Sequence, residues 1–493
     1  MGEGSSPRGH APPFPLLLRN AAAYGLARGI PGIVGFLALA TYTRLLSREQ
    51  YGAYTLAVAA AGLTYAMAFQ WLSLGVLRLV KSGRWGREVF LSSVLQCFAA
   101  GLLAVVVVAA ALVVTHRLAD PGLILIGVLL VAAQVWVELN LALAIAESDP
   151  VRYGKMAGTR AVVGFGAGAT LGLLGFGVKG VLLGVVAGYL VGGLWAAVRC
   201  WGGVAWRNGQ PEVRRTLVVY GFPLTVTYLL DFVVSTSDRV LLGAMRGPEA
   251  AGTYGAAYDL CQQSIWALMI ILTQSAYPVV VEAFERGGIR DARRPLLRHG
   301  VLLAGIAVPA ATGLAVLAPS ITGVVLPASY AAEMRSIVPL VAAAVLLGGL
   351  KSYYLDFSFQ LGHRTQGQMA AVALAATTNL GLNLLWIPRL GALGAAYATL
   401  TAYSVGLGAS WLLGRRVIAL PIPGRELLRI AAAALGMALV LWPVRVYVGV
   451  GALSAQLALG VLSYLGFALL VDIGGSRATL ARAWRHYRGA GTR

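Results

Sequence analysis

Long apolar runs recur along the whole chain and limit its fold more than any other feature. A helix needs about 20 apolar residues to cross a bilayer core, because lipid offers no partner to free backbone N–H and C=O groups. The 493-residue sequence holds fourteen runs that meet this requirement. They are approximately residues 19–43, 52–75, 89–114, 122–146, 157–177, 180–200, 216–239, 250–279, 299–318, 337–361, 369–388, 392–414, 430–448 and 452–472. The sequence therefore predicts an all-α polytopic membrane protein with about 14 transmembrane helices.

The composition supports this fold class and argues against several functions. Hydrophobic residues make up 58% of the chain and charged residues 12%, against roughly 45–50% and 25% in soluble domains. The net charge of +20 could suit a nucleic acid, but the basic residues form short clusters between apolar runs instead of one continuous face. The cysteines and histidines show no metal-ligand spacing, and no phosphate-binding glycine loop is present. We therefore expect no nucleic acid, metal or cofactor.

The distribution of lysine and arginine predicts the orientation. Connections on the N-terminal side of the membrane hold about three times as many of these residues as connections on the other side, as is typical of cytoplasmic connections. We therefore expect both termini in the cytoplasm, and the chain in the inner or plasma membrane of a bacterium or archaeon. Because every connection is short, we expect no soluble catalytic domain.

A repeated motif predicts the internal organisation. Residues Glu49–Tyr54 and Glu249–Tyr254 both read E-x-x-G-x-Y and stand at the second and eighth apolar runs. An offset of six helices predicts two pseudo-symmetric six-helix bundles, an organisation typical of transporters. The predicted parts are a cytoplasmic tail (1–18), an N-terminal bundle (19–200), a C-terminal bundle (216–414), an extra C-terminal helix pair (430–472) and a basic cytoplasmic tail (473–493).

Four segments carry a resemblance to a known family. They are the stretch from Leu18 to Gly52, then Tyr220–Leu224, Ser237–Arg239 and Gly391–Thr399. The chain resembles polysaccharide-transport flippases of the Wzx type over roughly residues 16–414. These flippases are part of the multidrug, oligosaccharidyl-lipid and polysaccharide exporter superfamily. The shared motifs are structural rather than catalytic, so they identify the superfamily better than the substrate.

The resemblance implies a function and partners. It implies that a polyprenyl-pyrophosphate-linked oligosaccharide is moved from the cytoplasmic to the outer leaflet by alternating access, for assembly of a surface polysaccharide. Membrane lipids, and a polysaccharide polymerase or export machinery, are the other partners that it implies.

Polar side chains inside the apolar runs are the candidate site residues, because each ionisable one costs a few kcal/mol at bilayer depth and usually faces a wet interior. Arg28 could bind pyrophosphate, or it could extend to the cytoplasmic headgroups. Asp259 and Gln262 lie on one predicted helix face and suit a sugar. Asn383 could bind the substrate, or it could only form a hydrogen bond to a neighbouring helix. The predicted substrate-binding residues are Arg28, Glu138, Arg239, Asp259, Gln262, Lys351 and Asn383.

Three carboxylates are candidates for coupling transport to a proton or cation: Asp231, Asp238 and Asp356. In an alternative interpretation, Asp238 and Arg239 form an ion pair that caps the helix near the outer interface. Lys351 and Asp356 are about 140° apart on an α-helix. We therefore expect each of them to need a partner on another helix, or water.

Several functions fit this pattern. Arg28, Arg239 and Lys351 favour an anionic cargo over the organic cations of a multidrug exporter. A peptidoglycan-precursor flippase has nearly the same physical requirements. A membrane-embedded glycosyltransferase or polymerase needs a substantial acidic or metal-binding loop, which the short connections do not provide. A structural scaffold is the last alternative, and we expect a transporter rather than an enzyme.

Overall fold

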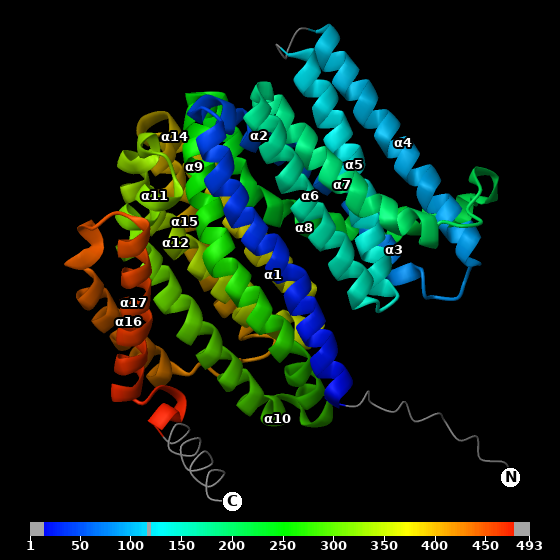
Figure 1. Ribbon diagram of the computed structural model, residues 1–493. Helices are drawn as coiled ribbons and strands as arrows, with labels where there is room; N and C mark the ends of the chain where they lie inside the picture. Colours follow the sequence, from blue (N-terminus) through cyan, green and yellow to red (C-terminus); the bar gives the residue numbers. More distant parts are fainter. Residues whose placement is uncertain (1–13, 116–119, 478–493) are drawn as a thin grey trace, which may run out of the picture.

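The computed structural model describes residues 14–115 and 120–477. Within these ranges, the side chains of residues 14–28, 195–199, 223–224 and 227 lie outside the description. The described residues form helices joined by short turns, and no strand occurs among them (Figure 1). The predicted all-α class is confirmed.

The helices follow the predicted apolar runs. The first part of the chain forms α1 (Phe14–Leu45), α2 (Arg48–Ala68), α3 (Gln70–Leu79), α4 (Arg87–Val114), α5 (Pro121–Ala146), α6 (Pro150–Leu171), α7 (Gly177–Cys200) and α8 (Pro211–Arg246). The second part forms α9 (Pro248–Cys261), α10 (Ala267–Val316), α11 (Ala318–Val325), α12 (Ala331–Leu350), α13 (Phe357–Leu361), α14 (Thr365–Leu390), α15 (Ala392–Gly414), α16 (Gly424–Leu441) and α17 (Val450–Leu470). Three π-helical turns are inserted between them: η1 (Gly172–Phe176), η3 (Gln262–Trp266) and η5 (Lys351–Leu355).

The thirteenth predicted span differs in its bounds. The run 430–448 was expected to be helical throughout, but α16 ends at Leu441 and the chain continues as a turn. Pro443 gives the reason, because proline has no N–H to donate and disfavours a helical conformation in the residue before it. The helix instead begins earlier, at Gly424.

Seven described helical stretches, or eight with the bent pair α2 and α3, are long and apolar enough to cross a membrane. Two of them exceed a single crossing, since Pro150–Leu194 has 45 residues and Pro248–Val316 has 69. Gly175 and Gly177 break the first with positive φ, and Gly287 and Gly288 break the second. Each of these stretches therefore holds two of the predicted crossings.

The helices pack in two main groups with a connecting layer. Helices α1 to α7 contact one another, chiefly α6 with α1 and α7, whereas α12, α14 and α15 form the centre of the second group. Helices α8 and α9 pack on α2 and α3 and so join the groups, and the pair α16 and α17 packs on α10 and α11 (Figure 1). The division into bundles at residues 200 and 216 stays a prediction.

The two copies of the repeated motif meet at the crossing of α2 and α9. A Cβ atom on Gly52 would lie 1.7 Å from the carbonyl oxygen of Pro248, and one on Gly252 would lie 2.8 Å from the nitrogen of Gly52. Both distances are far below van der Waals contact. The glycine in each motif therefore permits a close backbone approach, which is the usual role of small residues between membrane helices.

We expect Gly52→Ala to lower the free energy of unfolding by about 1–3 kcal/mol, because the added methyl group forces α2 and α9 apart. Thermal unfolding of the purified protein in detergent measures this loss. The matched control is Gly127→Ala in α5, where a Cβ meets no atom of the described residues within 4 Å. That substitution should leave stability unchanged or slightly improve it, because alanine favours a helix over glycine. Equal melting temperatures for both variants would contradict the close approach.

Candidate functional site

The most enclosed polar cluster surrounds Asp238 in α8. Its carboxylate is fully buried and accepts hydrogen bonds from Tyr254 Oη at 2.6 Å, from Thr399 Oγ1 at 2.5 Å and from the Asn383 amide. No cationic side chain among the described residues pairs with it. The alternative interpretation, an Asp238–Arg239 pair capping the helix, is wrong, because α8 continues to Arg246 and the two side chains have separate partners.

Two asparagines of α14 complete this cluster. The Asn379 Oδ1 atom accepts from Ser237 Oγ and from Asn383 Nδ2, each at 3.0 Å. The Asn383 Oδ1 and Asn379 Nδ2 atoms are buried and have no hydrogen-bond partner among the residues that the structure describes. A buried carboxylate beside an unpaired amide oxygen provides oxygen ligands of the type that a small hard cation prefers. The structure thus brings Asp238 and Asn383 together, although the sequence analysis assigned them to different roles.

Arg239 and Asp259 form an ion pair between α8 and α9. The Nη2 atom of Arg239 lies 2.6 Å from Oδ1 of Asp259, and the guanidinium lies 5.2 Å from the ring centroid of Tyr258. The arginine side chain is 11% exposed and the aspartate side chain 25%. Tyr51 and Tyr54 of α2 are within electrostatic range of both charges. This pair therefore lies where the second group of helices faces the first.

A similar ion pair lies within the first group. Glu138 of α5 pairs with Arg160 of α6 at 3.0 Å, and the guanidinium lies 5.1 Å from the ring centroid of Tyr189 in α7. Both charged side chains are about a quarter to a third exposed, at 27% for Arg160 and 30% for Glu138. Arg160 was not among the predicted site residues, although its position inside the apolar run 157–177 sets it apart. The first group and the connecting helices α8 and α9 thus each contain an arginine held by one carboxylate and one tyrosine ring.

Lys351 and Asp356 form a buried pair. Lys351 Nζ lies 2.8 Å from Asp356 Oδ2, and the side chains are 5% and 1% exposed. Ser410 Oγ donates to the other carboxylate oxygen at 2.8 Å. The expectation that the two residues do not pair was wrong, because this segment is a π-helix in which Asp356 N bonds to Lys351 O. A π-turn brings residues i and i+5 onto one face.

The remaining predicted residues occupy less defined positions. Asp231 is exposed, has no hydrogen bond or ion pair with the described residues, and lies within electrostatic range of Lys351 and Asp356. Gln262 is exposed in η3 and also lacks such a partner. Arg28 lies in α1, but its side chain is outside the described residues. Contact of these residues with a cargo stays a prediction.

Arg48, a second residue that the sequence analysis missed, joins three helices. It pairs with Glu249 at the start of α9, at 3.1 Å, and with Glu333 in α12, at 2.7 Å. Its guanidinium lies 5.4 Å from the ring centroid of Tyr330. These contacts lie beside the crossing of α2 and α9, at the end opposite to the start of α1 (Figure 1). This end of the interface between the two groups of helices is therefore closed by charge pairing as well as by close packing.

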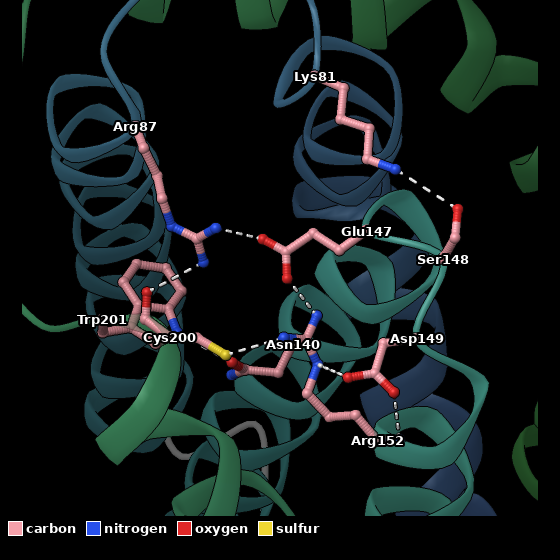
Figure 2. Close-up of polar contacts among 9 residues, drawn as sticks. All are labelled: Lys81, Arg87, Asn140, Glu147, Ser148, Asp149, Arg152, Cys200 and Trp201. Carbon is pink, nitrogen blue, oxygen red and sulfur yellow. Dashed lines mark hydrogen bonds and ion pairs between the residues drawn. The ribbon is translucent and has the colours of Figure 1, made fainter.

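At the other end of the first group, polar contacts tie the short connections together. Figure 2 shows Glu147 between two arginines, bonded to Arg87 and, at 2.6 Å, to Arg152. The Trp201 indole donates to Asn140 Oδ1 at 2.9 Å in the same region. These contacts join the ends of α4, α5, α6 and α7. We therefore infer that the cluster stabilises the first group of helices.

Two solved structures share this fold. The lipid II flippase MurJ in an inward closed conformation aligns with a TM-score of 0.75 and 15% identity, over 91% of this chain and 98% of that chain. An inward-facing multidrug resistance MATE family transporter of the MOP superfamily aligns with a TM-score of 0.52 and 16% identity, over 84% and 95%. The described residues therefore share the fold of these two membrane proteins.

The chain belongs to the polysaccharide biosynthesis protein family, whose model matches residues 17–284. A curated relative, the probable flippase AglR of Haloferax volcanii, is 28% identical over 181 residues. That match spans 34% of this chain and only 35% of the relative's length. The predicted resemblance to polysaccharide-transport flippases is confirmed at the level of the family, and the apolar helices are those of a multi-pass membrane protein.

Proposed function

We propose that the protein is a flippase that moves a polyprenyl-pyrophosphate-linked oligosaccharide from the cytoplasmic to the outer leaflet for surface polysaccharide assembly. The observation that carries the proposal is Arg239, a partly exposed cation in a membrane helix that is held by one carboxylate. Its guanidinium stays charged and can bind two phosphate oxygens at once. Membership of a polysaccharide biosynthesis family supports the same class of cargo.

The two arginine–carboxylate pairs suggest how the headgroup is held. Moving a diphosphate and its sugars through hydrocarbon strips their water at a high free-energy cost. Arg239 and Arg160 can replace that water when a phosphate group takes the place of Asp259 or Glu138. The adjacent Tyr258 and Tyr189 rings suit sugars, which present hydroxyls and an apolar face together. The polyprenyl tail stays in lipid.

Alternating access requires one closed end at a time. With both termini in the cytoplasm, the closed end formed by Arg48, Glu249 and Glu333 faces outward, and the cargo enters from the cytoplasmic side. Opening toward the outside then separates α2 from α9 and breaks these ion pairs. This step is the proposed release of the cargo into the outer leaflet.

We assign cation or proton coupling to Asp238, with Asp231 and Asp356 as the other proposed coupling residues. A fully buried carboxylate without a cationic partner is stable only if it is hydrogen-bonded, protonated or bound to a cation. Binding at Asp238 links α8, α9, α14 and α15, because Asp238 lies in α8 and its three partners come from the other three helices. Occupancy of this site can therefore bias how these helices pack.

Asp238→Asn should abolish the response of transport to a sodium or proton gradient and slow transport about tenfold, as expected for a typical coupling energy of 1–3 kcal/mol. The measurement is cargo transfer in proteoliposomes with and without each gradient. Asp231→Asn tests the second coupling residue, and exposed Asp291→Asn is the control. A variant at Asp238 that still responds fully to the gradient would move the coupling site elsewhere.

Reconstitution with defined cargoes tests the proposed function itself. Proteoliposomes receive a fluorescent polyprenyl-pyrophosphate oligosaccharide, and transfer between leaflets is followed by quenching from outside. Faster transfer without chemical change supports flipping, and an altered product indicates an enzyme. The likeness to a lipid II flippase makes a lipid-linked peptidoglycan precursor the second candidate cargo. Transport of an organic cation such as ethidium, without transfer of either lipid, would indicate a multidrug exporter.

A further inference from the structure

A large apolar groove runs between α10, α16 and α17, away from the site described above. The part of the groove near the start of α16 has a volume of about 1240 Å³ and extends from Arg293 and Arg425 to Tyr464. Gly305, Ile306 and Tyr464 also line a second pocket of about 560 Å³, which continues to Leu317 and Leu441. Because the two pockets share residues, they form one continuous groove along the membrane-spanning part of α10.

One end of this groove is positively charged. Arg293 and Arg298 of α10 and Arg425 of α16 line it, all three are exposed, and none has a hydrogen bond or ion pair with the described residues. The acidic residue beside them, Glu426, is already occupied, because it accepts from Arg429 at 2.9 Å and from the Gly474 amide at 2.7 Å. Residues 478–493 contain no Asp or Glu that could neutralise the arginines.

The charged end lies where α1 begins and α17 ends, which we expect to be the cytoplasmic side (Figure 1). In that orientation we expect the arginines to face the headgroups of the inner leaflet and the apolar wall of the groove to face the acyl chains. Basic pockets between membrane helices on this side bind anionic lipid headgroups. The ligand that matches both parts carries a phosphate at one end and hydrocarbon chains at the other.

We propose that this groove binds an anionic glycerophospholipid, with its phosphate on Arg293, Arg298 and Arg425 and its acyl chains along α10. The occupant is a lipid that stays in place and not the cargo, because the diphosphate has its own arginines in the helix pairs α8–α9 and α5–α6. Such a lipid fills the space between α10 and the α16–α17 pair. The lipid thereby holds the α16–α17 pair against α10.

The test uses the full chain in a neutral detergent, with phosphatidylglycerol and phosphatidylcholine as probes. Native mass spectrometry measures binding, and the melting temperature reports stabilisation. The triple variant R293Q/R298Q/R425Q should bind phosphatidylglycerol about 100-fold more weakly, since each arginine near an anionic headgroup contributes about fivefold. The control R84Q/R207Q/R215Q removes the same charge from exposed arginines before α4, before α8 and near the start of α8, and should bind normally.

A second variant keeps the test decisive if the triple variant does not fold. Ile306→Trp fills the groove but retains the three arginines, and it should also lose phosphatidylglycerol. Equal binding of phosphatidylcholine and phosphatidylglycerol by the unmodified protein would overturn the proposal, as would equal weakening in the control variant. If geranylgeranyl diphosphate displaces phosphatidylglycerol at equal concentration, the groove holds the cargo's tail and the proposal is also overturned.

Discussion

The Asp356→Asn variant is expected to lose about 3–5 kcal/mol of unfolding free energy, because it leaves the Lys351 ammonium buried without its counter-charge. The substitution keeps an acceptor oxygen for Ser410, so it removes the charge with little change in shape. Unfolding in mixed detergent micelles, followed by tryptophan fluorescence, measures the loss. It is the largest stability effect that we expect from a single side-chain change in this protein.

Two further variants distinguish the buried pair from a general loss of charge. The double variant K351M/D356N should recover most of the stability, because neither charge is then left alone in the interior. Lys179→Met is the matched control, since Lys179 pairs with Asp120 at an exposed position and holds the pKa of that carboxyl below its usual value. That control should unfold almost like the unmodified protein. An Asp356→Asn variant of normal stability would mean that the pair carries no net charge interaction.

Arg239→Ala should slow transfer of the lipid-linked oligosaccharide between leaflets about 100-fold. The estimate follows from removing a desolvated charge partner, which typically costs about 2–5 kcal/mol. Arg239→Lys should recover only part of the rate, because lysine retains the charge but cannot bind two phosphate oxygens in a fork. Transfer in proteoliposomes, with the amount of reconstituted protein matched, measures all three rates.

This experiment must distinguish loss of cargo binding from the effect of leaving the carboxylate of Asp259 without its partner. The double variant R239A/D259N removes the unpaired charge that Arg239→Ala leaves behind, so it should be folded but equally slow. Arg286→Ala is the matched control, because Arg286 pairs with Glu282 on an exposed part of α10. If the double variant regains normal transfer, the defect came from the unpaired charge of Asp259, and Arg239 does not bind the cargo.

The positions of the helices were predictable because they depend on local composition. A run of about 20 apolar residues crosses the membrane wherever it lies in the chain, because a helix pairs its own backbone N–H and C=O groups and lipid offers them no other partner. The bend between α2 and α3 and the π-turn before α13 were not predictable in this way. They change the direction or register within an apolar run without altering its composition.

The candidate site could be predicted only as a set of unusual residues. Polar side chains such as Glu138, Asp238 and Lys351 stand out in apolar runs, and the structure places each of them in a polar contact. Their partners could not be predicted, because Asp238 meets Asn383 and Thr399 through packing of α8 against α14 and α15, across 145 and 161 residues of sequence.

The sequence by itself determined that this chain lies in a membrane as a set of helices, because the apolar composition of each segment decides whether lipid or water surrounds it. Only the tertiary structure decided which charges neutralise which. Arg239 bonds Asp259 rather than its neighbour Asp238, and Lys351 bonds Asp356 through a π-turn that an ideal helix would not allow. The physical reason is that a charge in a low-dielectric interior takes the partner that geometry brings within hydrogen-bond distance, whatever their separation along the chain.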